Sequence, residues 1–237
     1  MLGAVKGTSP EETPRPPSLP LRAADSVRRM IDLYTWTTPN GYKISIMLEE
    51  CGLEYAVHPV NLREGEQQLP AFRAVSPNGK IPAIVDRDSG TSVFESGAIL
   101  IHLAEKTGRF LPASGPGRAK VLEWLMWQMS AVGPILGQLN HFANQAEEKV
   151  PYAIERFAAE SARLIKVMDD RLADVAHLAG DDYSIADVAT YPWISVAFPL
   201  VRAIKSDVVG EGANVARWIA AIAERPAVAR GMAVPKV

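Results

Sequence analysis

Cysteine is almost absent from this sequence, since Cys51 is the single one among 237 residues. One cysteine can form neither an internal disulfide nor a Cys-x-x-Cys redox pair. This composition favours a reducing, cytoplasmic location. If the chain carries out thiol chemistry, most of the reacting sulfur must come from another molecule.

An excess of charge of one sign is also lacking, because 25 Lys and Arg stand against 27 Asp and Glu. This balance argues against nucleic acid as the main partner, since phosphate neutralisation needs a basic face. No apolar run reaches the roughly 20 residues that cross a bilayer, so no membrane partner is expected. Lys6, Glu11 and Glu12 interrupt any early apolar stretch that could act as a secretory signal.

Two further kinds of site have no sequence signal. The four histidines are scattered without metal-ligand spacing, so we expect no metal site. No glycine-rich phosphate-binding motif occurs. With 48% hydrophobic residues, the chain can still bury a sizeable core in one or two domains.

The sequence divides into three regions. Residues 1–29 hold five prolines among polar residues, which predicts a flexible N-terminal arm. Residues 30–112 alternate strand and helix patterns and predict a mixed α/β domain. Beyond Pro112 only helical periods occur, so 113–237 is predicted to be an all-helical domain.

The expected elements follow from these patterns. Strands are expected at 30–35, 55–60, 81–86 and in a short stretch ending at 94. Helices are expected from 39 to 52, near 71, at 95–106, 119–150, 152–177 and 184–198, with shorter ones beyond. The first helix and its flanking strands predict a βαβ unit with a parallel strand pair. Gly133-Pro134 predicts a bend in the helix at 119–150.

Three segments together resemble the soluble glutathione transferase superfamily. They read Ser-Pro-Asn-Gly-Lys-Ile-Pro at 76–82, Phe-Glu-Ser-Gly-Ala-Ile at 94–99 and Tyr-Ser-Ile-Ala-Asp at 183–187. The opening at 33–41, with Gly137-Gln138 and the segment 151–156, is similar to the bacterial disulfide-bond oxidoreductase branch, the nu class. The resemblance spans roughly 30–230. It implies a thioredoxin-like domain followed by a helical bundle, a homodimer, and glutathione bound to the first domain.

The resemblance places the tripeptide backbone and the γ-glutamyl end of glutathione. In the family the bond between Ile81 and Pro82 is cis, and the Ile81 backbone pairs with the ligand as an added strand. Taken alone, Pro82 also fits an ordinary edge-strand proline. Glu95 and Ser96 begin a helix, where free N–H groups and the Ser96 hydroxyl can bind the γ-glutamyl carboxylate and Glu95 can accept from its ammonium. Plain helix capping is the alternative for both residues.

The end of the first strand offers Tyr34, Thr37, Thr38 and Asn40 as activators of the bound sulfur. In the resembled branch the sulfur lies near the residues that match Thr38 and Asn40, and both side chains can donate hydrogen bonds to a thiolate. Thr38 has a competing role as a helix N-cap and Asn40 as a first-turn residue. Cys51, a whole helix away, is interpreted as a core cysteine.

Two further residues are assigned by resemblance. Gln67 matches a glutamine that contacts the glycyl end or backbone of glutathione. Arg156 matches an arginine of the helical domain that reaches ligand carboxylates, although a surface arginine beside Glu155 is the simpler interpretation. The S-x-x-D pattern at Ser184–Asp187 is interpreted as a structural capping box.

The resemblance implies an enzyme that uses bound glutathione to reduce disulfides or peroxides by thiol–disulfide exchange, with no protein cysteine. Conjugation of glutathione to electrophiles is the alternative activity. A non-catalytic regulator with the same fold is the alternative of another class.

Overall fold

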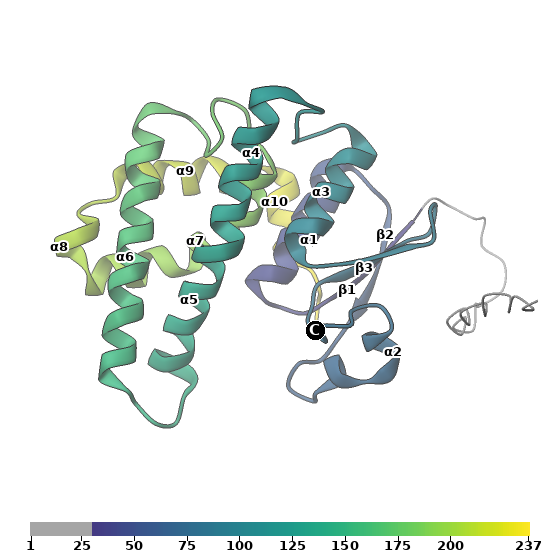
Figure 1. Ribbon diagram of the computed structural model, residues 1–237, viewed down its shortest axis with the longest axis horizontal. Coiled ribbons are helices and arrows are strands. Elements are labelled where there is room, and N and C mark those ends of the chain that lie inside the picture. Colours follow the sequence, from purple (N-terminus) through teal and green to yellow (C-terminus); the bar gives the residue numbers. More distant parts are fainter. Residues whose placement is uncertain (1–29) are drawn as a thin grey trace, which may run out of the picture.

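The computed structural model describes residues 30–237, and the arm expected at 1–29 lies outside the described residues (Figure 1). Four strands form one mixed sheet in the order β2-β1-β3-β4. They are β1 (Ile31–Thr35), β2 (Tyr55–Pro59), β3 (Ala83–Asp86) and β4 (Thr91–Phe94). β1 pairs with β2 in parallel and with β3 antiparallel, and β3 pairs antiparallel with β4. The parallel pair expected around the first helix is confirmed.

Helices cover the sheet. The first region contains α1 (Pro39–Cys51), a 3₁₀ turn at Glu66–Gln68 (η1), α2 (Pro70–Arg73) and α3 (Ser96–Thr107). In Figure 1, α1 and α3 lie together on one face of the sheet, and α2 lies apart from them. A small separate cluster of Val60, Phe72 and Ala83 packs under α2. The thioredoxin-like arrangement expected for this region is confirmed.

The rest of the described chain is helical apart from one isolated β-bridge. Its elements are α4 (Gly115–Trp127), a π-helical turn η2 (Gln128–Val132), α5 (Gly133–Asn140), a π-helical turn η3 (His141–Gln145), α6 (Pro151–Asp174), α7 (Ile185–Ile204), α8 (Ser206–Val209), α9 (Ala213–Ala223) and α10 (Pro226–Gly231). Because Pro134 has no N–H to donate, the helical ladder must adjust near it, and the π-helical turn η2 lies directly before α5.

Three expected helix ends were wrong, and the smallest error is in the helix expected at 152–177, which ends at Asp174. The helix expected to reach residue 150 ends at Gln145, where a second π-helical turn closes it. The helix expected to end at 198 continues to Ile204 although Pro192 and Pro199 lie inside it. The capping box at its start is confirmed, because Ser184 Oγ accepts from the Ala186 N–H and the Asp187 carboxylate accepts from the Ser184 N–H.

One main hydrophobic cluster runs through both regions, from Leu33 on β1 to Val228 on α10. The contact between α1 and α10 is close, since a Cβ added at Gly231 would lie 2.5 Å from the Ile46 Cα. The Ser45 hydroxyl donates to the Gly231 carbonyl at 2.7 Å. The end of the chain therefore packs on the first region, and the domain boundary expected at Pro112 stays a prediction.

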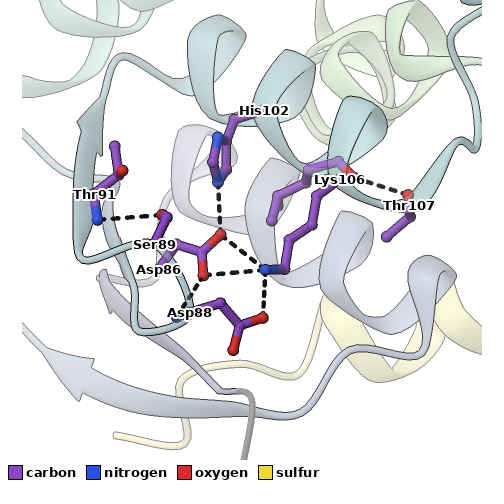
Figure 2. Close-up of polar contacts among 8 residues, drawn as sticks. Asp86, Asp88, Ser89, Thr91, His102, Lys106 and Thr107 are labelled. Atoms are coloured by element: carbon purple, nitrogen blue, oxygen red, sulfur yellow. Dashed lines mark hydrogen bonds and ion pairs between the residues drawn. The ribbon is translucent and has the colours of Figure 1, made fainter.

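A charged cluster fixes α3 to the sheet (Figure 2). His102 and Lys106 on α3 both contact the buried Asp86 carboxylate, at 2.9 and 3.0 Å, and Lys106 also reaches Asp88 at 2.7 Å. Burial alone would raise the pKa of Asp86, but the hydrogen bonds from His102 and Lys106 hold it below its usual value. The cluster joins the second half of α3 to the end of β3.

Candidate functional site

Three chain segments meet at the end of the sheet where β1 and β4 finish and β3 begins, and this end is called the sheet edge. Tyr34 near the end of β1 pairs with Ala83 at the start of β3, and Ala83 pairs with Phe94 at the end of β4. The segment after β1, the segment before β3 and the segment after β4 therefore lie side by side. These segments carry five of the residues predicted from the sequence, namely Thr38, Asn40, Ile81, Pro82 and Glu95, and Ser96 follows at once.

Thr38 is the N-cap of α1. Its backbone is extended, and its Oγ1 accepts a hydrogen bond from the Gly41 N–H at 3.2 Å. The capping role that competed with sulfur activation is therefore present. Capping uses the oxygen only as an acceptor, so the hydroxyl proton stays available to donate. Thr38 can cap the helix and donate to a ligand at the same time.

Asn40 is held by a residue of the helical region. Its Oδ1 accepts from Trp193 Nε1 on α7 at 3.0 Å. Because an indole nitrogen can only donate, this contact fixes which side of the amide carries oxygen. Within residues 30–237 the Asn40 Nδ2 has no partner, and it is free to donate to a ligand.

The Ile81–Pro82 peptide bond is cis, as the resemblance implied. Ile81 is half-buried and precedes β3, and its backbone makes no hydrogen bond to any described residue. Its N–H and carbonyl groups therefore remain free at the sheet edge. An extended peptide can pair with such groups as an added strand.

Glu95 stands in an uncommon backbone conformation at the start of α3. Its φ is 69°, a value that residues other than glycine rarely adopt. The Glu95 carboxylate accepts from Asn78 Nδ2 at 3.3 Å. Such strain is often found where a side chain is held for binding. Ser96, the first residue of α3, is 4% exposed and lies at the positive end of the helix dipole.

Behind Ser96 lies a buried lysine that sequence reasoning missed. Lys43 Nζ donates to Ser96 Oγ at 3.3 Å and to Gln128 Oε1 at 2.8 Å, and lies 3.6 Å from Met129 Sδ. Burial lowers the pKa of Lys43 to about 7, against the opposing field of Glu95. A lysine on a helix gives no sequence signal of burial, because the same pattern usually marks a solvated face.

Comparison with models of known protein families identifies the family of this chain. The model of the glutathione S-transferase N-terminal domain matches residues 30–105, and the model of the C-terminal domain matches 137–226. The chain belongs to the glutathione S-transferase family.

Relatives within the glutathione S-transferase family are close. The disulfide-bond oxidoreductase YfcG of Escherichia coli is 51% identical over 70% of this chain and 80% of that protein. The disulfide-bond oxidoreductase YghU of the same organism is 41% identical over 86% of this chain and 74% of that protein.

Solved structures share the glutathione transferase fold. A Burkholderia graminis glutathione transferase with two glutathione molecules bound per subunit matches with a TM-score of 0.82 and 43% identity, over 88% of this chain and 89% of that one. A Pseudomonas putida glutathione transferase with one glutathione disulfide bound per subunit matches with a TM-score of 0.81 and 40% identity, over 89% of this chain and 94% of that one.

Gln67 and Arg156 lie differently with respect to the edge. Gln67 belongs to η1, and a Cβ added at Gly79 would lie 3.2 Å from its carbonyl oxygen, so Gln67 borders the loop that leads to Ile81. Its buried Oε1 has no partner within the described chain. Arg156 instead lines a cavity of about 750 Å³ whose walls come from α5 and α6, and within residues 30–237 no hydrogen bond or ion pair joins it to the sheet edge. Its role stays a prediction.

Other candidates for sulfur chemistry fit less well. Cys51 is the last residue of α1, and a helix of this length places it about 18 Å from the end at Thr38. Burial raises the pKa of its thiol, which makes it a poor nucleophile. The Tyr34 ring stacks on His58 with 4.8 Å between centroids, on the cluster under α2. Residues 30–237 contain no group of three or more His, Cys, Asp or Glu placed to hold a metal ion. No helix in that range is long and apolar enough to cross a membrane.

Proposed function

We propose that this chain binds glutathione at the edge formed by Thr38, Asn40, Ile81 and Ser96, and that it reduces disulfides with the bound thiol. The Asn40 amide carries this proposal. Trp193 fixes the amide oxygen and leaves Nδ2 free to donate, in the first turn of α1 at the positive end of its dipole and two residues after the free Thr38 hydroxyl. Two donors and a helix N-terminus can stabilise a thiolate by the roughly 1.4 kcal/mol that lowers its pKa by one unit.

The remaining predicted residues would hold the rest of the tripeptide. The free Ile81 backbone would pair with the cysteinyl unit, and Glu95 and Ser96 would bind the γ-glutamyl ammonium and carboxylate. Gln67 would contact the glycyl end with its unpartnered amide. The relatives named as disulfide-bond oxidoreductases, and those with glutathione or its disulfide bound, support this choice of ligand.

The reaction needs no protein cysteine. The bound glutathione thiolate attacks one sulfur of the substrate disulfide, a new S–S bond forms, and the other substrate sulfur leaves as a thiolate that takes up a proton. A second glutathione thiolate then attacks the glutathione sulfur of this mixed disulfide. The products are glutathione disulfide and two substrate thiols, so two electrons pass from two glutathiones to one disulfide.

The test follows NADPH consumption in a glutathione reductase-coupled assay with 2-hydroxyethyl disulfide. The wild type should exceed the uncatalysed rate, and Asn40→Ala and Thr38→Ala should each lower the rate roughly tenfold. Thr37→Ala, at the exposed neighbouring threonine, is the matched control and should retain the rate. Activity equal to background would refute the proposal, and turnover of 1-chloro-2,4-dinitrobenzene in its place would identify a conjugating transferase.

Assembly and location are part of the same proposal. We expect a homodimer in the cytoplasm, where the single cysteine would stay reduced and glutathione is the abundant thiol. Sedimentation equilibrium should give twice the chain mass. A monomer at micromolar concentration would contradict the dimer without affecting the chemistry.

A further inference from the structure

Lys43 is a buried cation without a counter-ion. It is 1% exposed, and no carboxylate of residues 30–237 lies within ion-pair distance of its ammonium. Its partners are the neutral Ser96, Gln128 and Met129. Lysines are almost never fully buried unless paired, because an uncompensated charge loses its hydration. The described chain therefore leaves the ammonium form of Lys43 to be stabilised by an anion from outside.

The position of Lys43 points to where that anion binds. The ammonium lies 3.3 Å from Ser96 Oγ, which opens α3 with its free backbone N–H groups. An anion that contacts this first turn would lie one hydroxyl group away from the lysine. At that separation, and shielded from water, two opposite charges attract each other far more strongly than at the surface.

Lys43 also decides what the Ser96 hydroxyl can do. An ammonium can only donate, so Ser96 Oγ accepts from it and must point its own proton elsewhere. In the structure Ser96 Oγ donates to Met129 Sδ, 3.6 Å away, and a thioether is a weak acceptor. A carboxylate is a much stronger acceptor and would take the proton in its place. Lys43 thus fixes Ser96 as a donor toward the ligand.

We propose that Lys43 is a positioning residue that supplies the buried counter-charge for the α-carboxylate of the γ-glutamyl unit, acting through Ser96. This inference rests on the proposed function, because it names a further residue for the same ligand. Lys43 also joins the two regions, since Gln128 belongs to η2 of the helical region. Binding of the carboxylate would therefore tighten the contact between α1 and the helical region.

The charges around Lys43 are few. Glu95 at the start of α3 is the charged side chain whose field acts on it, and the groups that face it from α3 and η2 are otherwise neutral. The other charged residues of α1, Glu49 and Glu50, lie about two turns away and pair with arginines beyond Ala223. With a pKa of about 7, Lys43 loses its charge near neutral pH. An arriving carboxylate would raise the pKa of Lys43 and keep its ammonium protonated.

The test compares two probes by calorimetry. One is S-methylglutathione, whose blocked sulfur removes thiol titration, and the other is its analogue that lacks the α-carboxylate, S-methylated 4-aminobutyryl-cysteinyl-glycine. At pH 6, Lys43→Met should weaken S-methylglutathione about tenfold and leave the analogue unchanged, since tenfold corresponds to about one favourable charge contact. Lys106→Met, at a lysine that already has carboxylate partners, is the matched control and should change neither affinity.

Each outcome separates the two proposals. Equal weakening of both probes by Lys43→Met would mean that the lysine only supports the fold, and no weakening would also overturn the inference. A wild type that binds neither probe at millimolar concentration would refute the proposed function itself.

A measurement on the wild type keeps the test decisive if Lys43→Met does not fold. Between pH 6 and 8 the affinity for S-methylglutathione should fall about fivefold, because the free protein loses the Lys43 proton that the complex retains. The analogue without the carboxylate should show no such fall. A flat profile for both probes would contradict the role of Lys43.

Discussion

The two ends of α1 hold buried charge in opposite ways. In its last turns, Glu50 accepts two hydrogen bonds from Arg225, at 2.6 and 2.9 Å, and Glu49 is bound by Arg230 and by the Tyr55 hydroxyl. In its first turns, Lys43 has only neutral partners, the Thr38 hydroxyl proton is unused and the Asn40 Nδ2 has no partner among residues 30–237. The charged groups in the last turns of α1 are all paired within the described chain, whereas the first turns keep hydrogen-bond donors without a partner.

This difference indicates that the last turns of α1 contribute to stability and that its first turns are suited to binding a ligand. A buried charge with a full set of partners holds elements together and has nothing to offer a ligand. Donors left free in a mostly buried site cost free energy unless another molecule accepts from them. The Thr38 hydroxyl and the Asn40 Nδ2 are both donors and Lys43 is a cation, so a ligand that completes this end must supply acceptors, such as a thiolate and a carboxylate.

The largest effect is expected in the last turns of α1. Glu50→Ala should lower the free energy of unfolding by about 3 kcal/mol. It removes the buried carboxylate that accepts from Arg225 and leaves the Arg225 guanidinium without its partner. Urea unfolding measures the loss, and S-methylglutathione affinity of the folded variant should not change. Arg230→Ala breaks the more exposed pair at Glu49 and should cost less than about 1 kcal/mol. Equal losses for the two variants would contradict the difference in burial.

The second effect concerns the pH dependence of stability in the first turns of α1. The pKa of Lys43 is about 7 in the fold and 10.5 in the unfolded chain, so unfolding takes up a proton between these values. Raising the pH opposes that uptake, and the free energy of unfolding should rise by about 2 kcal/mol from pH 7 to 9. Urea unfolding of the wild type and of Lys43→Met measures it. The rise should disappear in the variant, and parallel profiles would show that Lys43 keeps its charge in the fold.

The third effect separates capping from donation at Thr38. Thr38→Ala removes the acceptor of the Gly41 N–H and should cost about 1 kcal/mol of stability. Thr38→Ser keeps the hydroxyl and should retain both stability and disulfide exchange. Thermal unfolding and the coupled assay on the same samples measure the two roles. A serine variant that is stable but inactive would show that the hydroxyl alone does not activate the sulfur.

The smallest effect is expected at Cys51. The thiol is half-buried with a raised pKa, and its Sγ lies 3.5 Å from Thr107 Oγ1. Cys51→Ala should cost less than about 1 kcal/mol and leave the rate of disulfide exchange unchanged. The coupled assay would contradict the borrowed-sulfur mechanism if this variant lost its activity.

Sequence patterns predicted most of the fold. The strand, helix and strand from residue 30 to 60 have the expected order, and Gly52 ends α1 with a positive φ. The errors lie where periodicity says little. Helix ends at 145 and 204 depend on π-helical turns and on prolines that neighbouring helices accommodate, and neither has a local signal in the sequence.

The candidate site was predicted less completely than the fold. Motif resemblance named Thr38, Asn40, Ile81 and Ser96, which meet at one edge because the strand register brings their segments together. It did not name Trp193, which lies 153 positions from its partner Asn40, nor Gln128, which lies 85 positions from Lys43. Contacts between residues so far apart in the chain leave no periodic trace in a single sequence.

The sequence by itself determined the order of the elements and the kinds of donor at the end of the first strand, because these depend on local spacing and on residue type. Only the tertiary structure decided that Lys43 is buried without a counter-ion and that the Asn40 amide turns its Nδ2 away from Trp193. Burial and hydrogen-bond partners depend on which surfaces meet when α1 is enclosed between the sheet and the helical region. That enclosure brings together residues from both regions and removes the water that would otherwise satisfy them.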